Sequence, residues 1–411
     1  MIFQKPYVTI LIIAILTTPY LNFGDFGAQI LMLLVATSIP NGRECFLKRK
    51  ELKVICSIFI AAATYSFMLF LSGHLDFKYL SRGISSSLYR IIEVFFCYKM
   101  LNYYGKKAFV YCFAGLVCAY SINIILALFT FGLGGVVQAF FSIFSFGFTG
   151  EGSDTNEILE SCHAVLLIMP FIAVFFLHEY IKNREISSLR IFIISAIISL
   201  LAFKRIAIGA SIIIFTFLFL QRLYNRYTLF IIASTCIIIG LGFIFIISSG
   251  IIYILMAQYD IELMFRDRIW KAIDDIYFFG TDFWGNGWGF TTKYIHEQSE
   301  RMIGVFVGGI HNDLLKVYID LGFWGFIIYF GFFLFYLPCR YYKMGRINTS
   351  FIFLLCQLYL FMMYFTDNSQ GYFACQSMAY ILPFSMAESN KIGTRPNNLM
   401  IKNRVSIQCQ K

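Results

Sequence analysis

Long apolar runs separated by short polar segments dominate the chain from its first residues to about position 387. Most of these runs approach the roughly 20 residues that an α-helix needs to cross a bilayer. They occupy residues 7–21, 26–40, 54–72, 84–101, 108–131, 163–180, 191–203, 206–220, 229–248, 314–337, 350–366 and 372–387. The pattern predicts an all-α integral membrane protein with about twelve transmembrane helices. Because the runs at 191–203 and 206–220 are short, they form either two short helices joined by a tight turn or one re-entrant segment that enters the membrane and leaves on the same side.

Composition supports a single polytopic domain rather than several soluble ones. Of the 411 residues, 59% are hydrophobic and only 14% are charged, whereas a soluble domain has about a quarter charged. We therefore expect one membrane domain over residues 1–387 and a disordered cytoplasmic tail over 388–411. The eleven cysteines show no CxxC spacing, which leaves a disulfide framework or a zinc site unsupported.

The net charge of +10 is explained by membrane orientation and does not indicate nucleic-acid binding. If the N-terminus is cytoplasmic, basic residues in the inner loops outnumber those outside by about two to one, as the positive-inside rule requires. Both termini are then cytoplasmic. Two substantial segments are left outside, at about 132–162 and 249–313. The second is the one long polar stretch before the tail, and its aromatic content predicts an ordered, docked segment.

Several basic residues of the outer side oppose the orientation bias. Lys204 and Arg205 lie in the turn between the two short runs, and charge beside a span is by default a functional-site hypothesis. The simpler alternative is a pair of side chains that reach the lipid headgroups. In RDRIW at 266–270, Arg266 and Trp270 are four residues apart and share a helical face, whereas Arg268 points elsewhere. Arginine suits bidentate capture of phosphate, although a salt bridge with a nearby aspartate is the structural alternative.

The end of the same outer segment holds two further candidates. GNGWGF at 285–290 contains Gly287, and its glycines allow close approach of the backbone to a ligand. His311, Asn312 and Asp313 stand where the segment enters the next apolar run. A histidine there can act as a general base; alternatively it neighbours a helix cap formed by Asn312 or Asp313. No paired carboxylates at glycosidase spacing and no HExxH motif occur, so we expect no metal and no cofactor.

Together these features resemble the O-antigen polymerase and O-antigen ligase superfamily of bacterial surface-polysaccharide assembly. The resemblance rests on about twelve spans with both ends inside, the basic pair at 204–205, RDRIW, the glycines at 285–287, and His311 and Asn312 followed by a glycine at 322. It covers most of the chain as topology and about 80 residues as motif.

The resemblance implies a metal-independent glycosyltransferase with a GT-C-like membrane fold in the bacterial inner membrane. Its donor is an oligosaccharide on undecaprenyl pyrophosphate, presented at the periplasmic face. Arg205 and Arg266 hold the pyrophosphate in this reading, and His311 serves the acceptor hydroxyl. Lys204, Arg268, Trp270, Gly287, Asn312 and Asp313 are the further substrate-binding candidates.

Three functions are compatible with the sequence, and they differ in what is done with the lipid-linked glycan. The extreme Phe and Ile content and short inner loops favour an O-antigen polymerase, which extends a lipid-linked repeat unit. A ligase that transfers the glycan to lipid A–core is the alternative, and a repeat-unit flippase is the third. Membrane lipid, a chain-length regulator and a flippase are the implied partners.

Overall fold

The computed structural model describes residues 5–17, 24–40, 47–142, 163–201, 205–259, 266–303, 309–366 and 373–387. Within these ranges every regular element is a helix, which confirms the all-α fold class. The predicted tail at 388–411 lies outside the described residues, as does the greater part of the predicted outer segment after position 142.

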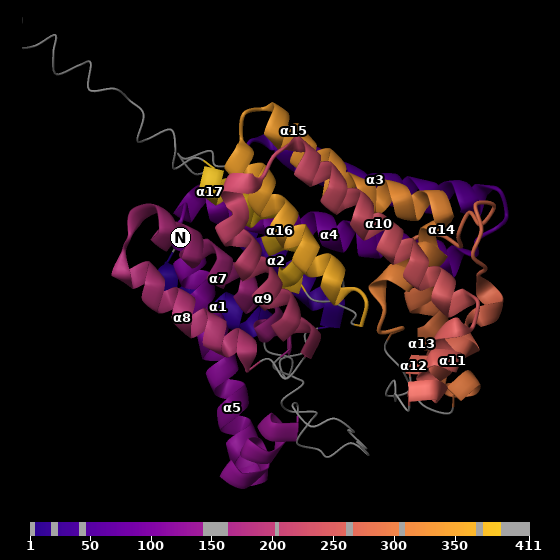
Figure 1. Cartoon of the computed structure of the whole chain (residues 1–411), viewed down its shortest axis with the longest axis horizontal. Coiled ribbons are helices and arrows are strands. Elements are labelled where there is room, and N and C mark those ends of the chain that lie inside the picture. Colours follow the sequence, from indigo (N-terminus) through magenta and orange to yellow (C-terminus); the bar gives the residue numbers. More distant parts are fainter. Residues whose placement is uncertain are drawn as a thin grey trace, which may run out of the picture.

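A helix occupies each of the apolar runs (Figure 1). Most bounds differ by a few residues, but the helix of the run at 84–101 begins at Phe77 and that of the run at 108–131 continues to Ser142. The helices are α1 (Pro6–Thr17), α2 (Gly24–Ser38), α3 (Arg49–Leu71), α4 (Phe77–Tyr104), α5 (Lys107–Ser142), α7 (His163–Asn183), α8 (Ile186–Leu200), α9 (Arg205–Phe219), α10 (Arg226–Ser248), α14 (Asp313–Gly331), α16 (Ile347–Met363) and α17 (Phe373–Ala387). The short pair is therefore two separate helices, α8 and α9, whose connection lies outside the described residues.

Five stretches of the described chain are long and apolar enough to cross a membrane. They are Arg49–Leu71, Lys107–Gln138, Ile206–Leu223, Arg226–Ser248 and Asp313–Lys343. Other apolar helices, such as α8 and α16, are shorter. The total of about twelve spans therefore stays a prediction.

Helix α4 has 28 residues but is not among these five. Its sequence carries Arg82, Arg90, Glu93 and Lys99 together with several serines, so its mean hydropathy is low for a span. Despite this polarity it packs against α2, α3 and α17, and Arg90 and Glu93 are buried. Helix α4 is thus a polar helix within the helical bundle.

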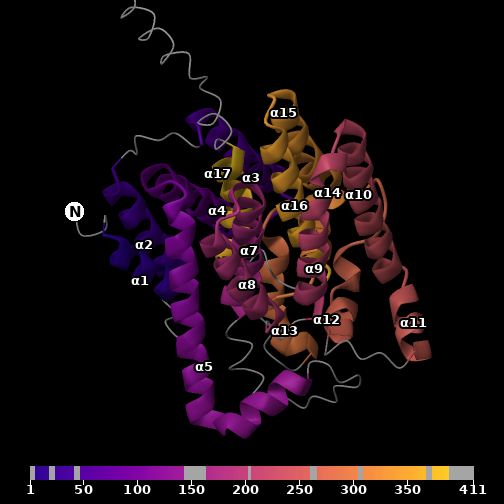
Figure 2. The same ribbon diagram turned by 60° about the vertical axis from the view of Figure 1, so that its left-hand side comes forward.

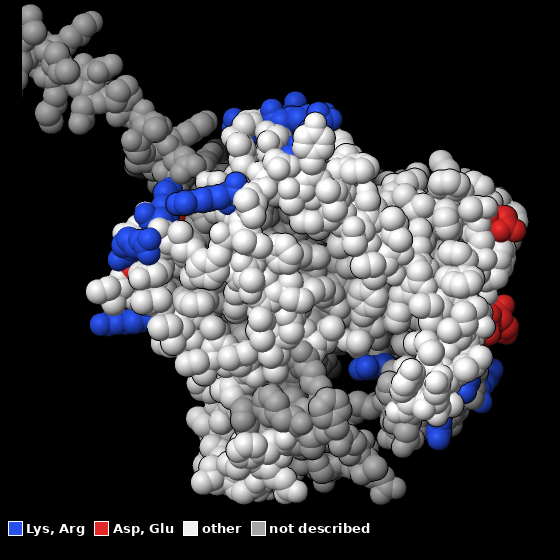
Figure 3. Space-filling view, viewed as in Figure 1, with Lys and Arg blue, Asp and Glu red and all other residues white. Residues whose placement is uncertain are grey.

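The segment after α10 is folded rather than extended. It forms α11 (Ile251–Tyr259), α12 (Arg266–Ala272), a 3-10 turn at Asp274–Ile276 and α13 (Phe290–Ile303). Figure 2 shows α11, α12 and α13 at one end of the bundle and α15 (Leu337–Lys343) at the other. Figure 3 shows basic side chains over both ends and a broad band with few charges between them. That arrangement is typical of a protein whose middle faces lipid.

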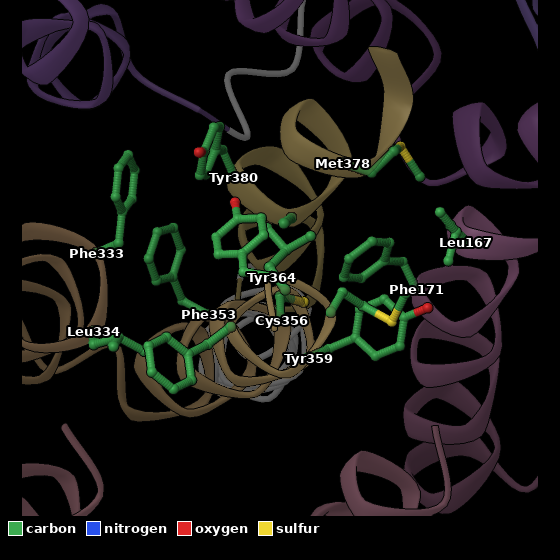
Figure 4. Packing of buried hydrophobic residues seen from close by; sticks show 14 of the residues in the cluster. Leu167, Phe171, Phe333, Leu334, Phe353, Cys356, Tyr359, Tyr364, Met378 and Tyr380 are labelled. Carbon is green, nitrogen blue, oxygen red and sulfur yellow. The ribbon is translucent and has the colours of Figure 1, made fainter. Parts of the chain in front are cut away.

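Aromatic side chains fill the core between α7, α16, α17 and the turn that follows α14 (Figure 4). Phe333 lies in the π-helical turn (Phe332–Tyr336) that joins α14 to α15, and its ring stacks on Tyr380 with centroids 4.9 Å apart. Tyr359 of α16 meets Phe171 of α7 edge to face at 5.1 Å. These contacts pack the turn after α14 against α17, and α16 against α7.

Helix α5 extends beyond its predicted end at 131. Gly132 has φ +69° and ψ 173° and interrupts the helix, which then resumes to Ser142. The first part of the predicted outer segment is therefore helical, because a glycine bends the helix and apolar residues continue it.

Candidate functional site at the start of α14

The RDRIW sequence forms the first five residues of α12. As predicted, Arg266 and Trp270 share one side of this helix and Arg268 lies on another. Ile269 and Trp270 are buried, Arg268 is exposed and Arg266 is half-buried. Arg266 and Trp270 lie one helical turn apart, so a buried tryptophan fixes the helix face that carries Arg266.

Trp270 connects α12 to the residue before His311. Its indole Nε1 donates a hydrogen bond to the carbonyl oxygen of Ile310 at 3.2 Å. Its ring meets Phe243 of α10 edge to face, with centroids 6.3 Å apart. The structure therefore brings RDRIW and the His-Asn-Asp sequence together, although 40 residues separate Trp270 from Ile310.

His311 has an unusual backbone conformation. Its φ is +51°, in the left-handed region that L-residues other than glycine rarely adopt. The side chain is half-buried, between the buried residues Ile310 and Asn312. Residues held in this region often occur at functional sites, where the surrounding structure maintains them. The acid–base role of His311 stays a prediction.

Asn312 is the N-cap of α14. Its Oδ1 accepts a hydrogen bond from the backbone N–H of Leu315 at 2.9 Å. Of the two predicted cap residues, Asn312 and Asp313, the structure therefore has Asn312 as the cap. Its side chain is fully buried, and its Nδ2 has no hydrogen-bond partner among the described residues. Asp313 is also fully buried and lies in the first helical turn, where a carboxylate interacts favourably with the helix dipole. Substrate contacts of either residue stay a prediction.

The loop between the 3-10 turn at Asp274–Ile276 and α13 contains the glycines of GNGWGF, and these glycines allow it to pack directly against α14. Helix α14 is broken at Gly322, which has φ +73° and ψ −175°. The carbonyls freed by the break accept loop N–H groups: Asn286 donates to Ile319 at 2.9 Å and Gly287 to Asp320 at 2.8 Å. A side chain on Gly285 would collide with the backbone of Gly322. The close approach that these glycines allow is therefore to the protein's own helix, and a ligand contact of Gly287 stays a prediction.

The carboxylate of Asp320 strengthens this docking. It accepts hydrogen bonds from the backbone of Gly289 at 2.9 Å and from the backbone and hydroxyl of Thr291 at 2.8 and 2.6 Å. Asp320 is fully buried. Three donors satisfy the charged group, as a buried carboxylate requires. The loop and the first part of α14, up to Gly322, are thus held together by these hydrogen bonds.

The basic pair at 204–205 is only partly described. Arg205 is the first residue of α9, but its side chain and the whole of Lys204 lie outside what the structure describes. Their predicted roles therefore stay predictions.

A group of charged residues within the bundle was missed by the sequence reading. Arg90 and Glu93 of α4 form a buried ion pair at 2.9 Å. Lys316 of α14 lies in electrostatic range of Asp313 and Asp320 and, more weakly, of the α4 arginines. The signal was present in the sequence, because charged residues inside apolar runs are costly and mark functional sites by default.

Asp274 and Asp275 are adjacent carboxylates in the 3-10 turn after α12. Burial, and after it the neighbouring Asp275 carboxylate, raise the pKa of Asp274. Among the described residues no group of three histidine, cysteine or acidic side chains is arranged to hold a metal ion. Metal independence of the reaction stays a prediction.

These features define a helical membrane protein whose candidate site joins an arginine-bearing loop helix to a His-Asn-Asp helix start. Comparison with protein families gives a match to the O-antigen ligase family model over residues 190–330. The matched region contains α9 to α13 and most of α14, and it confirms the resemblance to the O-antigen polymerase and ligase superfamily. No curated protein and no solved structure matches the chain.

Proposed function

We propose that the protein is an O-antigen (surface polysaccharide) polymerase of the bacterial inner membrane. It transfers a growing glycan from undecaprenyl pyrophosphate to a new lipid-linked repeat unit at the periplasmic face, without a metal ion. The single observation that carries this proposal is the contact between Trp270 and Ile310. In support of the proposal, Trp270 of the arginine-bearing helix contacts the residue before the candidate base, in the region that the family model matches.

The chemistry requires two kinds of group. A hydroxyl oxygen of the acceptor sugar attacks the anomeric carbon of the donor and forms the new glycosidic bond. The bond from that carbon to the pyrophosphate oxygen breaks, and the pyrophosphate leaves with the electron pair. His311 takes the hydroxyl proton, and Arg266 and Arg205 stabilise the charge that develops on the leaving oxygen. Arg268, Lys204 and Trp270 assist in holding the donor.

An O-antigen ligase is the second candidate function, favoured by the description of the matching family, O-antigen ligase. The donor and the chemistry are then the same, but the acceptor is lipid A–core. A repeat-unit flippase is a third and weaker candidate, because transporters often show matching broken helices in two halves, and no internal repeat is evident in the sequence.

An assay with purified protein separates these functions. We expect the protein in lipid nanodiscs, given lipid-linked repeat units alone, to produce a ladder of longer lipid-linked chains. Transfer only after lipid A–core is added would establish a ligase. Movement of repeat units across a vesicle membrane without any new glycosidic bond would establish a flippase. A chain-length regulator, our proposed partner, should narrow the ladder when it is added.

The orientation of the chain is a linked proposal, with both termini cytoplasmic and the segment around 249–313 periplasmic. Its support is the separation of α11–α13 from α15 at opposite ends of the bundle (Figure 2). Reporter fusions after Lys107, Arg226 and Arg346 should be active in the cytoplasm, and a fusion at Gly287 should be active in the periplasm. A cytoplasmic Gly287 would reject the orientation and the proposed site with it.

A further inference from the structure

The last part of α5, residues 133–142, is a short helix of its own. Gly132 has φ +69° and ψ 173° and separates it from the long first part of α5. Figure 2 shows it turned sideways from that first part, at the end of the bundle where α11, α12 and α13 lie. We call residues 133–142 the end helix of α5.

The end helix presents an uncovered apolar side. Leu133, Val137 and Phe141 follow one another at intervals of four residues, so they share one side of the helix. Their side chains are 71%, 44% and 65% exposed. Val136, beside them, is half-buried and packs against Ala127 of the first part of α5. An apolar contact within α5 thus supports the bend, and the larger apolar side chains beyond it stay exposed.

The other side of the end helix is small and uncharged. It carries Gly134, Gly135 and Gln138. Glycine has no side chain, so the backbone polar groups beside it remain open to water or to lipid headgroups. No charged residue occurs anywhere between Lys107 and Glu151. The end helix is therefore amphipathic without being charged.

The bend lies where α5 has just crossed the membrane. From Lys107 to Gly132 the helix rises by roughly 37 Å at about 1.5 Å per residue, and the hydrocarbon core of a bilayer is about 30 Å thick. The stretch Lys107–Gln138 is among the apolar segments able to span a membrane. If Lys107 stands at one surface, Gly132 stands at the other. The end helix then begins at the boundary between acyl chains and headgroups.

We propose that the end helix of α5 lies in the plane of the membrane and binds its lipid surface. Leu133, Val137 and Phe141 insert between the acyl chains and headgroups of the leaflet nearest α11–α13, and Gln138 faces the headgroups and water. A helix without charge binds such a surface by burying apolar area and not by attracting anionic lipids. The inference goes beyond the proposed glycan transfer and does not rest on it.

A second copy of the chain fits this face less well than lipid does. A stable protein–protein interface buries about 800 Å² on each partner, contributed by roughly 20–30 residues. The whole of residues 133–142 offers fewer residues than that, and only one side of the helix is apolar. A lipid surface needs no such area, because the helix is already tethered to the membrane by the first part of α5.

Tryptophan fluorescence of the full-length protein in phosphatidylcholine vesicles tests the proposal. Val137→Trp adds an indole on the apolar side, and its emission is the difference between the variant and the native protein. We expect lipid brominated on the upper part of its acyl chains to quench most of this added emission. Acrylamide, a neutral quencher dissolved in the water, should remove little of it.

Gln138→Trp is the matched control, because it adds the same indole one residue along, on the other side of the helix. Its added emission should be quenched mainly by acrylamide. A charge placed on the apolar side should release the helix: Phe141→Glu, combined with Val137→Trp, should shift quenching from brominated lipid to acrylamide. Gln138→Glu in the same Val137→Trp protein adds the same charge on the polar side and should leave the quenching unchanged.

Three results would overturn the proposal. Quenching of the Val137→Trp indole mainly by acrylamide would place the helix in water. Protection from both quenchers would mean that protein covers the apolar side, either a second copy or another part of the chain. Equal quenching of Val137→Trp and Gln138→Trp by brominated lipid would place the whole helix inside the membrane. Because no substrate is needed, each result is independent of whether the protein extends glycan chains.

Discussion

Replacement of His311 by glycine and by alanine separates its chemistry from its backbone conformation. Both variants lose the imidazole and its contacts, so their difference isolates the effect of the φ of +51° at this position. Glycine adopts that conformation without strain, whereas alanine does not. We therefore expect His311→Gly to fold at least as well as His311→Ala, and both variants to be impaired in catalysis.

The magnitude follows from the backbone angle. The left-handed conformation costs an L-residue about 1–2 kcal/mol, and glycine avoids this cost but loses about 0.5–1 kcal/mol more in chain entropy on folding. His311→Gly should thus be more stable than His311→Ala by up to about 1.5 kcal/mol. If His311 accepts the proton of the acceptor hydroxyl, both variants should lose roughly 10²–10⁴ in turnover, the usual contribution of general acid–base catalysis.

Thermal unfolding of the purified variants in detergent and chain extension with lipid-linked repeat units provide the two readouts. Donor binding should change little, because the arginines are intact. If His311→Gly extends chains at the native rate, His311 has no acid–base role. If the alanine variant is the more stable of the two, the assigned backbone strain is wrong.

Three other perturbations test the site and its supports. Arg266→Ala and Arg205→Ala should each abolish polymer formation while the amount of protein in the membrane stays unchanged. Lysine should substitute poorly at either position, because its ammonium group cannot make the bidentate contact of a guanidinium group. If both alanine variants still produce full-length polysaccharide, the pyrophosphate is bound by other residues. Gly322→Ala should destabilise the protein by about 1–3 kcal/mol, since its ψ of −175° at positive φ is open almost only to glycine, and a native unfolding temperature would contradict this. The hydrogen bond from Lys78 at 2.7 Å lowers the pKa of Glu297. Its contribution should therefore be complete above the ordinary glutamate pKa and be lost as the pH falls through the lowered value, measured as faster hydrogen exchange of α13. Glu297→Gln should show the fast exchange at every pH.

The sequence predicted the helices well because an apolar run must be buried in lipid or protein, and a helix satisfies its backbone there. It predicted their ends less well. Helix α3 begins at Arg49, before the apolar run at 54, because a helix continues through charged residues into the interface. Hydropathy marks the lipid-facing part of a helix and does not mark its capped end.

The candidate site was predictable where it depends on local pattern. The shared face of Arg266 and Trp270 follows from helical spacing, and the cap by Asn312 follows from residue type. The hydrogen bond from Trp270 to Ile310 and the docking of the glycine loop on Asp320 are long-range contacts, which no short pattern encodes.

The break of α14 at Gly322 has a consequence for the order in which the chain assembles. The N–H groups of Asn286 and Gly287 find their acceptors on Ile319 and Asp320, which the ribosome makes later. In the proposed orientation the loop lies in the periplasm, so during synthesis it crosses the membrane with these amides still bonded to water. Conversely, the N–H of Phe323 in α14 donates to Phe283 of the loop at 2.9 Å, so α14 cannot complete its own bonding until the loop has returned to it. We expect loop and helix to mature in a single late step, after α14 has been inserted. Chains truncated before residue 323 should therefore leave the loop sensitive to protease.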